Sequence, residues 1–230
     1  VRVLYAEKSY QSYEITRKIN GELISEVHYA DLEGKVREGE SRNYSKGKLS
    51  TVYTYKSGSM NGLFMLFHEN DTLKAKGYYK AGLLDSNLVS YYRTGVQKRK
   101  DYYQKGELVE GKCFSSLGLD TAYFEFETDP EFIGETGNVG SWLAKNVKYP
   151  DEAIEYGIQG KIFIGFVVDT LGNVTKLKIL KGNDPSLIKE SLRVMELMPQ
   201  WKPGTLDGEV VMARYVVPIN FKLDGAGYYS

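Results

Sequence analysis

The sequence has few of the residues that build disulfides, metal centres and membrane spans. Among its 230 residues there is one cysteine, Cys113, and there are two histidines, His28 and His68. An intrachain disulfide and a cysteine zinc site are therefore excluded, and we expect no metal site. No apolar run approaches the roughly 18 residues that a transmembrane helix needs. Lysine plus arginine and aspartate plus glutamate both number 30, so the chain lacks the basic excess that is typical of nucleic-acid-binding proteins.

Motifs of the common catalytic sites are also lacking. The sequence contains no phosphate-binding loop, no nucleophile elbow and no cluster of metal ligands. Acidic residues are plentiful around positions 125–131, but their place in a Pro- and Gly-marked stretch indicates a solvated segment rather than a pair of catalytic carboxylates. We therefore expect a protein that is not an enzyme, with no catalytic residues, no cofactor and no nucleic-acid partner.

Prolines and tyrosines are distributed unevenly along the chain. All six prolines follow residue 129, whereas 14 of the 19 tyrosines precede it. Such a shift in composition indicates two segments with different architectures. We expect a first domain over residues 1–126, a linker over residues 127–139 and a second domain over residues 140–224. Because the chain starts at Val1, without a methionine or a signal-peptide pattern, we also expect a leader, an anchor or a larger part upstream.

The first segment repeats with a period of 24 residues. The period is carried by four glycines and three tyrosines: Gly34, Gly58, Gly82, Gly106, Tyr55, Tyr79 and Tyr103. Tyrosine packs well on a pleated sheet and glycine supplies the positive φ of a tight turn, so each period predicts two short strands and two turns. A single hairpin is marginally stable, and we expect an all-β antiparallel meander in which neighbouring units pack together. The tyrosine rows either pack between repeats or form an exposed aromatic face that binds a peptide, a glycan or a lipid surface.

The spacing and the Gly/Tyr pattern of residues 30–126 resemble MORN-type repeats, in the divergent form common in bacterial envelope proteins. The clearest unit is Gly77-Tyr78-Tyr79-Lys80-Ala81-Gly82-Leu83-Leu84. The resemblance implies a scaffold or an interaction module, and it carries no catalytic residues with it.

The second segment predicts a small α+β domain. Pro150 ends one short helix and opens another, because the residue before a proline is pushed out of the helical region. Gly160 opens a strand, and residues 169–173 form a hairpin turn to a returning strand. Asp184 caps a further helix, with Pro185 at its first position. The expected fold is a three-stranded antiparallel sheet with helices on one face.

The last strand is the longest one that the sequence predicts. Apolar side chains alternate without a break from position 211 to position 223, which is typical of a half-buried strand. Pro218 has no N–H to donate to a ladder, so we expect this strand at an edge of the sheet.

The second segment strongly resembles the C-terminal domain of TonB, the periplasmic energy transducer of Gram-negative bacteria, over residues 140–224. The resemblance is carried by residues that occur together and in order: Tyr149, Pro150, Gly160, Gly172, Trp201, Pro203, Gly204, Pro218 and Phe221. The Tyr-Pro start, the Trp-Lys-Pro-Gly segment and the Pro-Ile-Asn-Phe end are more specific together than any one of them alone.

The resemblance implies a peptide-binding function. Domains of this family bind the TonB box, a short peptide of TonB-dependent outer-membrane receptors, which adds to the sheet as a strand and transmits the pulling force that opens the receptor. By analogy, the pairing edge spans residues 210–217. The implied partner-binding residues are Asn146, Val147, Lys148, Val210, Met212, Arg214 and Val216. The alternative is that the last strand only packs the core and keeps a solvated outer face.

The resemblance also implies a place in the cell envelope. We expect the periplasm of a Gram-negative, Bacteroidetes-like bacterium, with an anchor or signal upstream through which the protein would reach inner-membrane motor proteins. The repeats stand where a TonB protein has its spacer. The alternative function is therefore a periplasmic scaffold or adaptor that binds a protein, a glycan or another envelope partner through the repeat segment.

Overall fold

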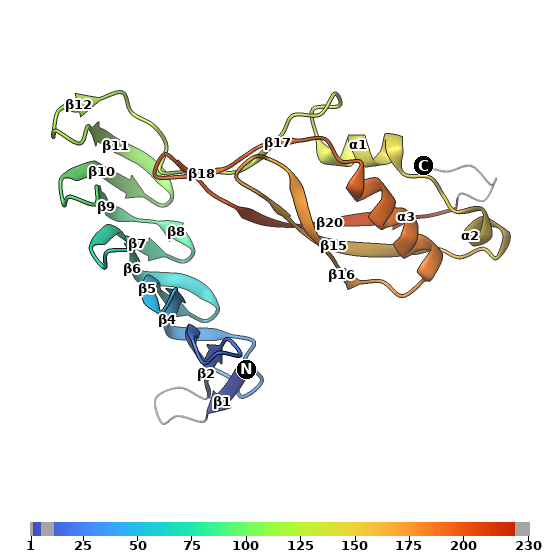
Figure 1. Ribbon diagram of the computed structural model, residues 1–230, viewed down its shortest axis with the longest axis horizontal. Coiled ribbons are helices and arrows are strands. Elements are labelled where there is room, and N and C mark those ends of the chain that lie inside the picture. Colours follow the sequence, from blue (N-terminus) through green and yellow to red (C-terminus); the bar gives the residue numbers. More distant parts are fainter. Residues whose placement is uncertain (1, 6–11, 224–230) are drawn as a thin grey trace. The chain divides into compact units, whose positions relative to one another are not determined.

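The computed structural model describes residues 2–5 and 12–223 (Figure 1). The chain divides into two compact units, Val1–Tyr123 and Phe124–Ser230. The expected domain ends at Val1 and at residue 224 lie outside the described residues. Each unit contains its own β-sheet structure.

The first unit is an antiparallel β-meander, as the sequence predicts. Its strands are β1 (Arg2–Tyr5), β2 (Ser12–Arg17), β3 (Leu23–Tyr29), β4 (Arg37–Ser45), β5 (Lys48–Lys56), β6 (Ser59–Phe67), β7 (Leu73–Lys80), β8 (Leu83–Leu84), β9 (Ser86–Tyr91), β10 (Gln97–Gln104), β11 (Glu107–Phe114) and β12 (Asp120–Thr121). Each strand pairs with the next one along the chain, except that β7 pairs with β9 and the short β8 joins β7 at the side.

Tight turns recur along the meander. Three two-residue turns lie 24 residues apart and have positive φ at both positions: Ser57-Gly58, Ala81-Gly82 and Lys105-Gly106. Such turns match the twist of the paired strands, and glycine takes the second position without steric cost. The amide of Gly82 donates to the carbonyl of Met60 at 2.8 Å, and the amide of Gly106 donates to that of Leu84 at 2.8 Å. The turn at Gly82 is therefore hydrogen-bonded to β6, and the turn at Gly106 is hydrogen-bonded to β8.

The tyrosines of the meander divide between its two faces. Tyr103 is 8% exposed, and the ring of Tyr79 packs against that of Phe64 with centroids 5.2 Å apart. Their chain neighbours Tyr78 and Tyr102 are each 44% exposed. Tyr79 and Tyr103 of the 24-residue period thus pack inward, whereas their chain neighbours Tyr78 and Tyr102 point outward.

In the residues that the structure describes, the second unit is built on a three-stranded antiparallel sheet with three helices. Its strands are β13 (Glu127–Thr128), β14 (Glu131–Phe132), β15 (Gly160–Val168), β16 (Val174–Lys181), β17 (Trp201–Lys202), β18 (Thr205–Leu206), β19 (Glu209–Val210) and β20 (Ala213–Phe221). Its helices are α1 (Val139–Asn146), α2 (Asp151–Glu155) and α3 (Pro185–Glu196). The main sheet has the order β16-β15-β20, so β20 lies at an edge as predicted.

The helices pack against one face of this sheet. Ile162 and Ile164 of β15 are 1% and 0% exposed and belong to the same core as Leu143 of α1, Ala153 of α2 and Leu187 of α3. Successive side chains of a strand point to opposite faces, so alternate positions of β15 build this core. The sheet therefore keeps its other face away from the helices.

The segment expected to be a linker, residues 127–139, belongs instead to the second unit. Within it, β13 pairs with β18 and β14 pairs with β17. Phe132 is 8% exposed, and its ring lies 5.4 Å from that of Trp201 in a T-shaped arrangement. The composition does not show this, because Pro and Gly mark turns but do not reveal pairing with strands much later in the chain.

The last strand is shorter than the alternation predicts. β20 begins at Ala213, and residues 211–212 lie outside the strands. β19 folds back on β18 through a turn at Asp207-Gly208, where both residues have positive φ. The amide of Val211 donates to the carbonyl of Gly204 at 3.0 Å, which diverts the chain from a continuous strand. The side-chain alternation already starts at Val211, before β20 begins, so it does not reveal the break.

Candidate binding groove at the edge of the second sheet

The two edges of the sheet β16-β15-β20 differ in how open they are. β16 is irregular, because Lys176 has a φ of 53° and the register with β15 shifts twice. Bulges and lysines of this kind discourage pairing with another strand. β20 pairs with β15 over nine consecutive residues without a shift, from Gly160 opposite Phe221 to Val168 opposite Ala213. No described strand pairs with the outer edge of β20.

Even-numbered residues of β20 direct their amides toward this outer edge. In an antiparallel strand, successive amides point to opposite sides. The amide of Leu223 donates at 3.0 Å to the side chain of Gln159, which immediately precedes β15, so odd-numbered amides face β15. Pro218 fits this arrangement, because a proline is tolerated in a sheet where its nitrogen faces away from the ladder. The amides of Arg214 and Val216 therefore face the outer edge.

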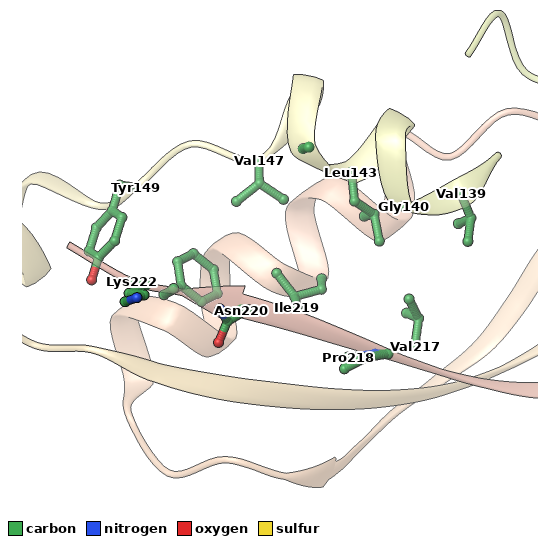
Figure 2. Close-up of a pocket in the computed structure, with 12 residues that line it drawn as sticks. Val139, Gly140, Leu143, Val147, Tyr149, Val217, Pro218, Ile219, Asn220 and Lys222 are labelled. Carbon is green, nitrogen blue, oxygen red and sulfur yellow. The ribbon is translucent and has the colours of Figure 1, made fainter. Parts of the chain in front are cut away.

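An apolar groove of about 450 Å³ lies between α1 and β20 (Figure 2). Its lining comes from α1, from the segment after α1 and from the end of β20: Val139, Gly140, Leu143, Ala144, Val147, Tyr149, Val217, Pro218, Ile219, Asn220, Phe221 and Lys222. Val139, Leu143 and Val147 are spaced by four residues and form one wall (Figure 2). An extended chain in this groove would contact apolar side chains of α1 while its backbone lay beside β20.

Two charged residues of α3 hold the segment after α1 in place. Glu190 is 8% exposed and accepts a hydrogen bond from the Lys148 amide at 2.6 Å. Arg193 donates to the Glu190 carboxylate at 2.6 Å and to the carbonyl of Asn146 at 3.0 Å. Burial opposes the ionisation of Glu190, but the hydrogen bonds from Arg193 and from the Lys148 amide outweigh it and lower the pKa of this carboxyl. The ion pair thus fixes the backbone beside the groove.

The structure brings several of the implied partner-binding residues to the groove and the edge. Arg214 and Val216 are exposed on β20. Val147 lines the groove. Asn146 and Lys148 flank Val147, and their backbone atoms are bonded to α3.

Other residues differ from the sequence-based expectation. Val210 and Met212 are 49% and 62% exposed, but they precede β20 and do not belong to its edge. Val139 and Leu143 are absent from the expected set, although they line the groove. Their spacing to Val147 on a short helix is the signal that could have found them.

The residues that carry the family resemblance form the framework around the sheet. Trp201 is 7% exposed, and a Cβ on Gly172 would collide with its carbonyl, which accounts for the glycine. The ring of Tyr149 lies edge-on to that of Phe221, with centroids 5.6 Å apart. The other members lie at the ends of elements or at the sheet edge: Pro150, Gly160, Pro203, Gly204 and Pro218.

The groove is lined mainly by apolar side chains, and its titratable lining residues are Tyr149 and Lys222. Among the described residues, no group of three or more His, Cys, Asp or Glu is placed to hold a metal ion. No helix formed by the described residues is long and apolar enough to cross a membrane.

The sheet β16-β15-β20 thus has one irregular edge, one open edge and an adjoining apolar groove. Residues 145–223 match the family described as the Gram-negative bacterial TonB protein C-terminal, and this part of the second unit is a TonB C-terminal domain. TonB family proteins are non-enzymatic.

The curated relatives that match this chain include proteins named Protein TonB. The protein of Vibrio cholerae serotype O1 is 35% identical over 80 residues, which cover 34% of this chain and 32% of that protein. The protein of Xanthomonas campestris pv. campestris (strain B100) is 30% identical over 94 residues, which cover 40% of this chain and 41% of that protein. The chain thus spans between 32% and 41% of the length of these relatives.

Proposed function

We propose that the TonB C-terminal domain of this chain binds an extended receptor peptide, the TonB box, by adding it as a strand to β20. The observation that carries the proposal is the open outer edge of β20 beside an apolar groove. In complexes of this kind, main-chain hydrogen bonds supply affinity and side-chain pockets supply selectivity. The more irregular edge at β16 makes β20 the better template.

The setting of this function is the cell envelope. The similarity to TonB proteins supports a role in energy-coupled transport, with the periplasm as the location and outer-membrane receptors as partners. Inner-membrane motor proteins are the further partners that such a role implies.

The geometry of β20 restricts how a peptide pairs with it. The amides of Arg214, Val216 and Asn220 donate toward the outer edge, whereas Pro218 between them donates nothing. The pairing stretch is therefore β20 itself, rather than residues 210–217. Alternate side chains of the added strand meet the wall formed by Leu143 and its neighbours on α1, which favours a ligand with apolar residues at alternate positions.

A proline at an outward position of β20 tests the proposal. Val216 is 55% exposed, so Val216→Pro removes one outward donor and leaves the core face unchanged, whereas Val216→Ala keeps the donor. One lost hydrogen bond is worth about 0.5–1.5 kcal/mol, which predicts about two- to twelvefold weaker binding of a fluorescent TonB-box peptide to the proline variant alone. Melting curves first establish that both variants are folded. Equal binding by the folded proline variant and wild type, or no binding by wild type, contradicts strand addition.

We also propose that the meander is an array of MORN-type repeats that folds independently of the second unit. The recurrence of two-residue turns at Gly58, Gly82 and Gly106, and the bonds from these turns to the preceding unit, support this interpretation. In such an array each repeat is stabilised mainly by its neighbours. The meander would then act as a spacer or scaffold.

A further inference from the structure

Lysines form a row across the outward face of the meander. Val89 of β9 pairs with Lys76 of β7 on one side and with Lys100 of β10 on the other. Lys100 pairs in turn with Lys112 of β11. Neighbouring strands lie about 4.8 Å apart, so Lys76 and Lys100 are about 10 Å apart along this row.

Tyrosines form the adjacent row on the same face. Tyr78 and Tyr102 follow Lys76 and Lys100 by two positions on their strands, and each tyrosine is 44% exposed. Among the residues that alternate with them, Ala75, Gly77, Arg99, Asp101 and Tyr103 are buried on the opposite face. The name Lys/Tyr face is used for Lys76, Tyr78, Lys100, Tyr102 and Lys112.

Among the described residues, no carboxylate forms an ion pair with a lysine of the Lys/Tyr face, and Glu110 is the exposed carboxylate that shares a hollow with Lys100 and Lys112. Lysines at the turns of the meander are neutralised, since Lys46 lies 2.9 Å from Glu69 and Lys48 lies 2.8 Å from Asp71. The chain as a whole has no net charge, so a row of three lysines that form no ion pair with a described carboxylate is a local feature. Such a row attracts an anionic partner.

A hollow of about 280 Å³ opens on this face between β9, β10 and β11. It is lined by Asn87, Lys100, Asp101, Tyr102, Glu110 and Lys112. The Asp101 carboxylate is engaged by the buried Arg99 at 2.6 Å. The two lysines therefore remain to bind a negative charge, while Asn87 and Glu110 offer hydrogen bonds to hydroxyl groups. Because the Glu110 carboxylate repels anions, a ligand must place its hydroxyls there and its negative charge near the lysines.

We propose that the Lys/Tyr face binds an acidic polysaccharide, a polymer of sugars that carry carboxylates. A sugar acid combines the negative charge, the hydroxyl groups and the apolar ring face that the lysines, Glu110 and the ring of Tyr102 accommodate. A phospholipid surface or a nucleic acid supplies charge but fewer hydroxyls for Asn87 and Glu110. This binding is independent of the peptide-binding groove, since the face lies in the first unit.

Calorimetric titration of the whole chain with polygalacturonate tests this proposal. Each exposed ion pair contributes about two- to fivefold in affinity, so the double variant Lys100→Gln, Lys112→Gln should bind about 4- to 25-fold more weakly. Tyr102→Ala should weaken binding about two- to tenfold, whereas Tyr102→Phe keeps the ring and should bind like wild type. The matched control Lys46→Gln, Lys48→Gln removes the same charge from paired lysines and should change the affinity less than about twofold.

Two further ligands separate this binding from general attraction to anions or to sugars. Neutral dextran should not bind, and phosphatidylglycerol vesicles should bind more weakly than polygalacturonate. Equal losses in the two double variants would mean a nonspecific charge effect and overturn the proposal. It is likewise overturned if dextran binds as well as polygalacturonate, if vesicles bind and polygalacturonate does not, or if wild type binds no polygalacturonate.

Discussion

Replacing Phe132 with alanine should strongly destabilise the second unit. The side chain is 8% exposed, and its ring lies 6.3 Å from that of Trp142 and 5.4 Å from that of Trp201. Truncation of a buried phenylalanine costs about 3–5 kcal/mol of unfolding free energy, and the exposed fraction places this case at the lower end, about 3 kcal/mol. In a unit of about 100 residues, such a loss lowers the melting temperature by roughly 12–24 °C.

Tryptophan fluorescence during thermal unfolding measures this effect in the second unit alone, because both tryptophans of the chain, Trp142 and Trp201, lie there. The matched control is Ile133→Ala at the neighbouring position, where the side chain is 58% exposed and the expected cost is below about 0.5 kcal/mol. If Phe132→Ala also costs less than about 0.5 kcal/mol, residues 127–139 are a solvated linker and the packing derived from the structure is refuted.

Three further predictions concern the two units and the groove. Tyr103→Ala should cost the first unit about 2–4 kcal/mol and the outward-facing Tyr102→Ala less than about 1 kcal/mol, so equal costs in denaturant unfolding contradict a two-faced meander. Glu190→Gln should cost the second unit about 1–2 kcal/mol at pH 7. Because folding lowers the pKa of Glu190 from 4.5, its stabilisation is present above that pH and is lost as the pH falls through the folded-state pKa. The unfolding free energy of Glu190→Gln should therefore fall less than that of wild type as the pH is lowered. The same pH dependence in both proteins counts against the ion pair. Limited proteolysis should leave a resistant fragment that starts near residue 124, whereas a start near residue 140 would support the linker.

Elements that depend on neighbouring residues could be predicted from the sequence. Asp184 caps α3 and Pro185 takes its first position, so the helix begins where these residues predict. The turn at residues 169–173 closes through a hydrogen bond from the Asp169 amide to the Asn173 carbonyl at 3.0 Å. The outward positions of Arg214 and Val216 followed from a period of two, which assigns each residue of a strand to one face.

Features that depend on distant residues could not be predicted in the same way. β13 and β14 have two residues each and show no periodicity, and their partners β18 and β17 are far along the chain. The apolar alternation starts at Val211, two residues before β20 begins, so the pattern places Met212 on the last strand although it lies outside that strand, and Val210 belongs to β19. The groove needs α1 beside β20, a packing arrangement that neither segment reveals alone.

Amide hydrogen exchange, measured by NMR on the whole chain with and without a TonB-box peptide, tests most directly whether β20 is the pairing edge. Strand addition predicts that the amides of Arg214 and Val216 exchange rapidly in the protein alone, because they face the outer edge. At a peptide concentration of about 100 times Kd, their exchange should slow by up to about 100-fold, while the amides of β16 remain unchanged. Slower exchange along β16 instead, or unchanged exchange at Arg214 and Val216 in the peptide-bound protein, would contradict pairing at β20.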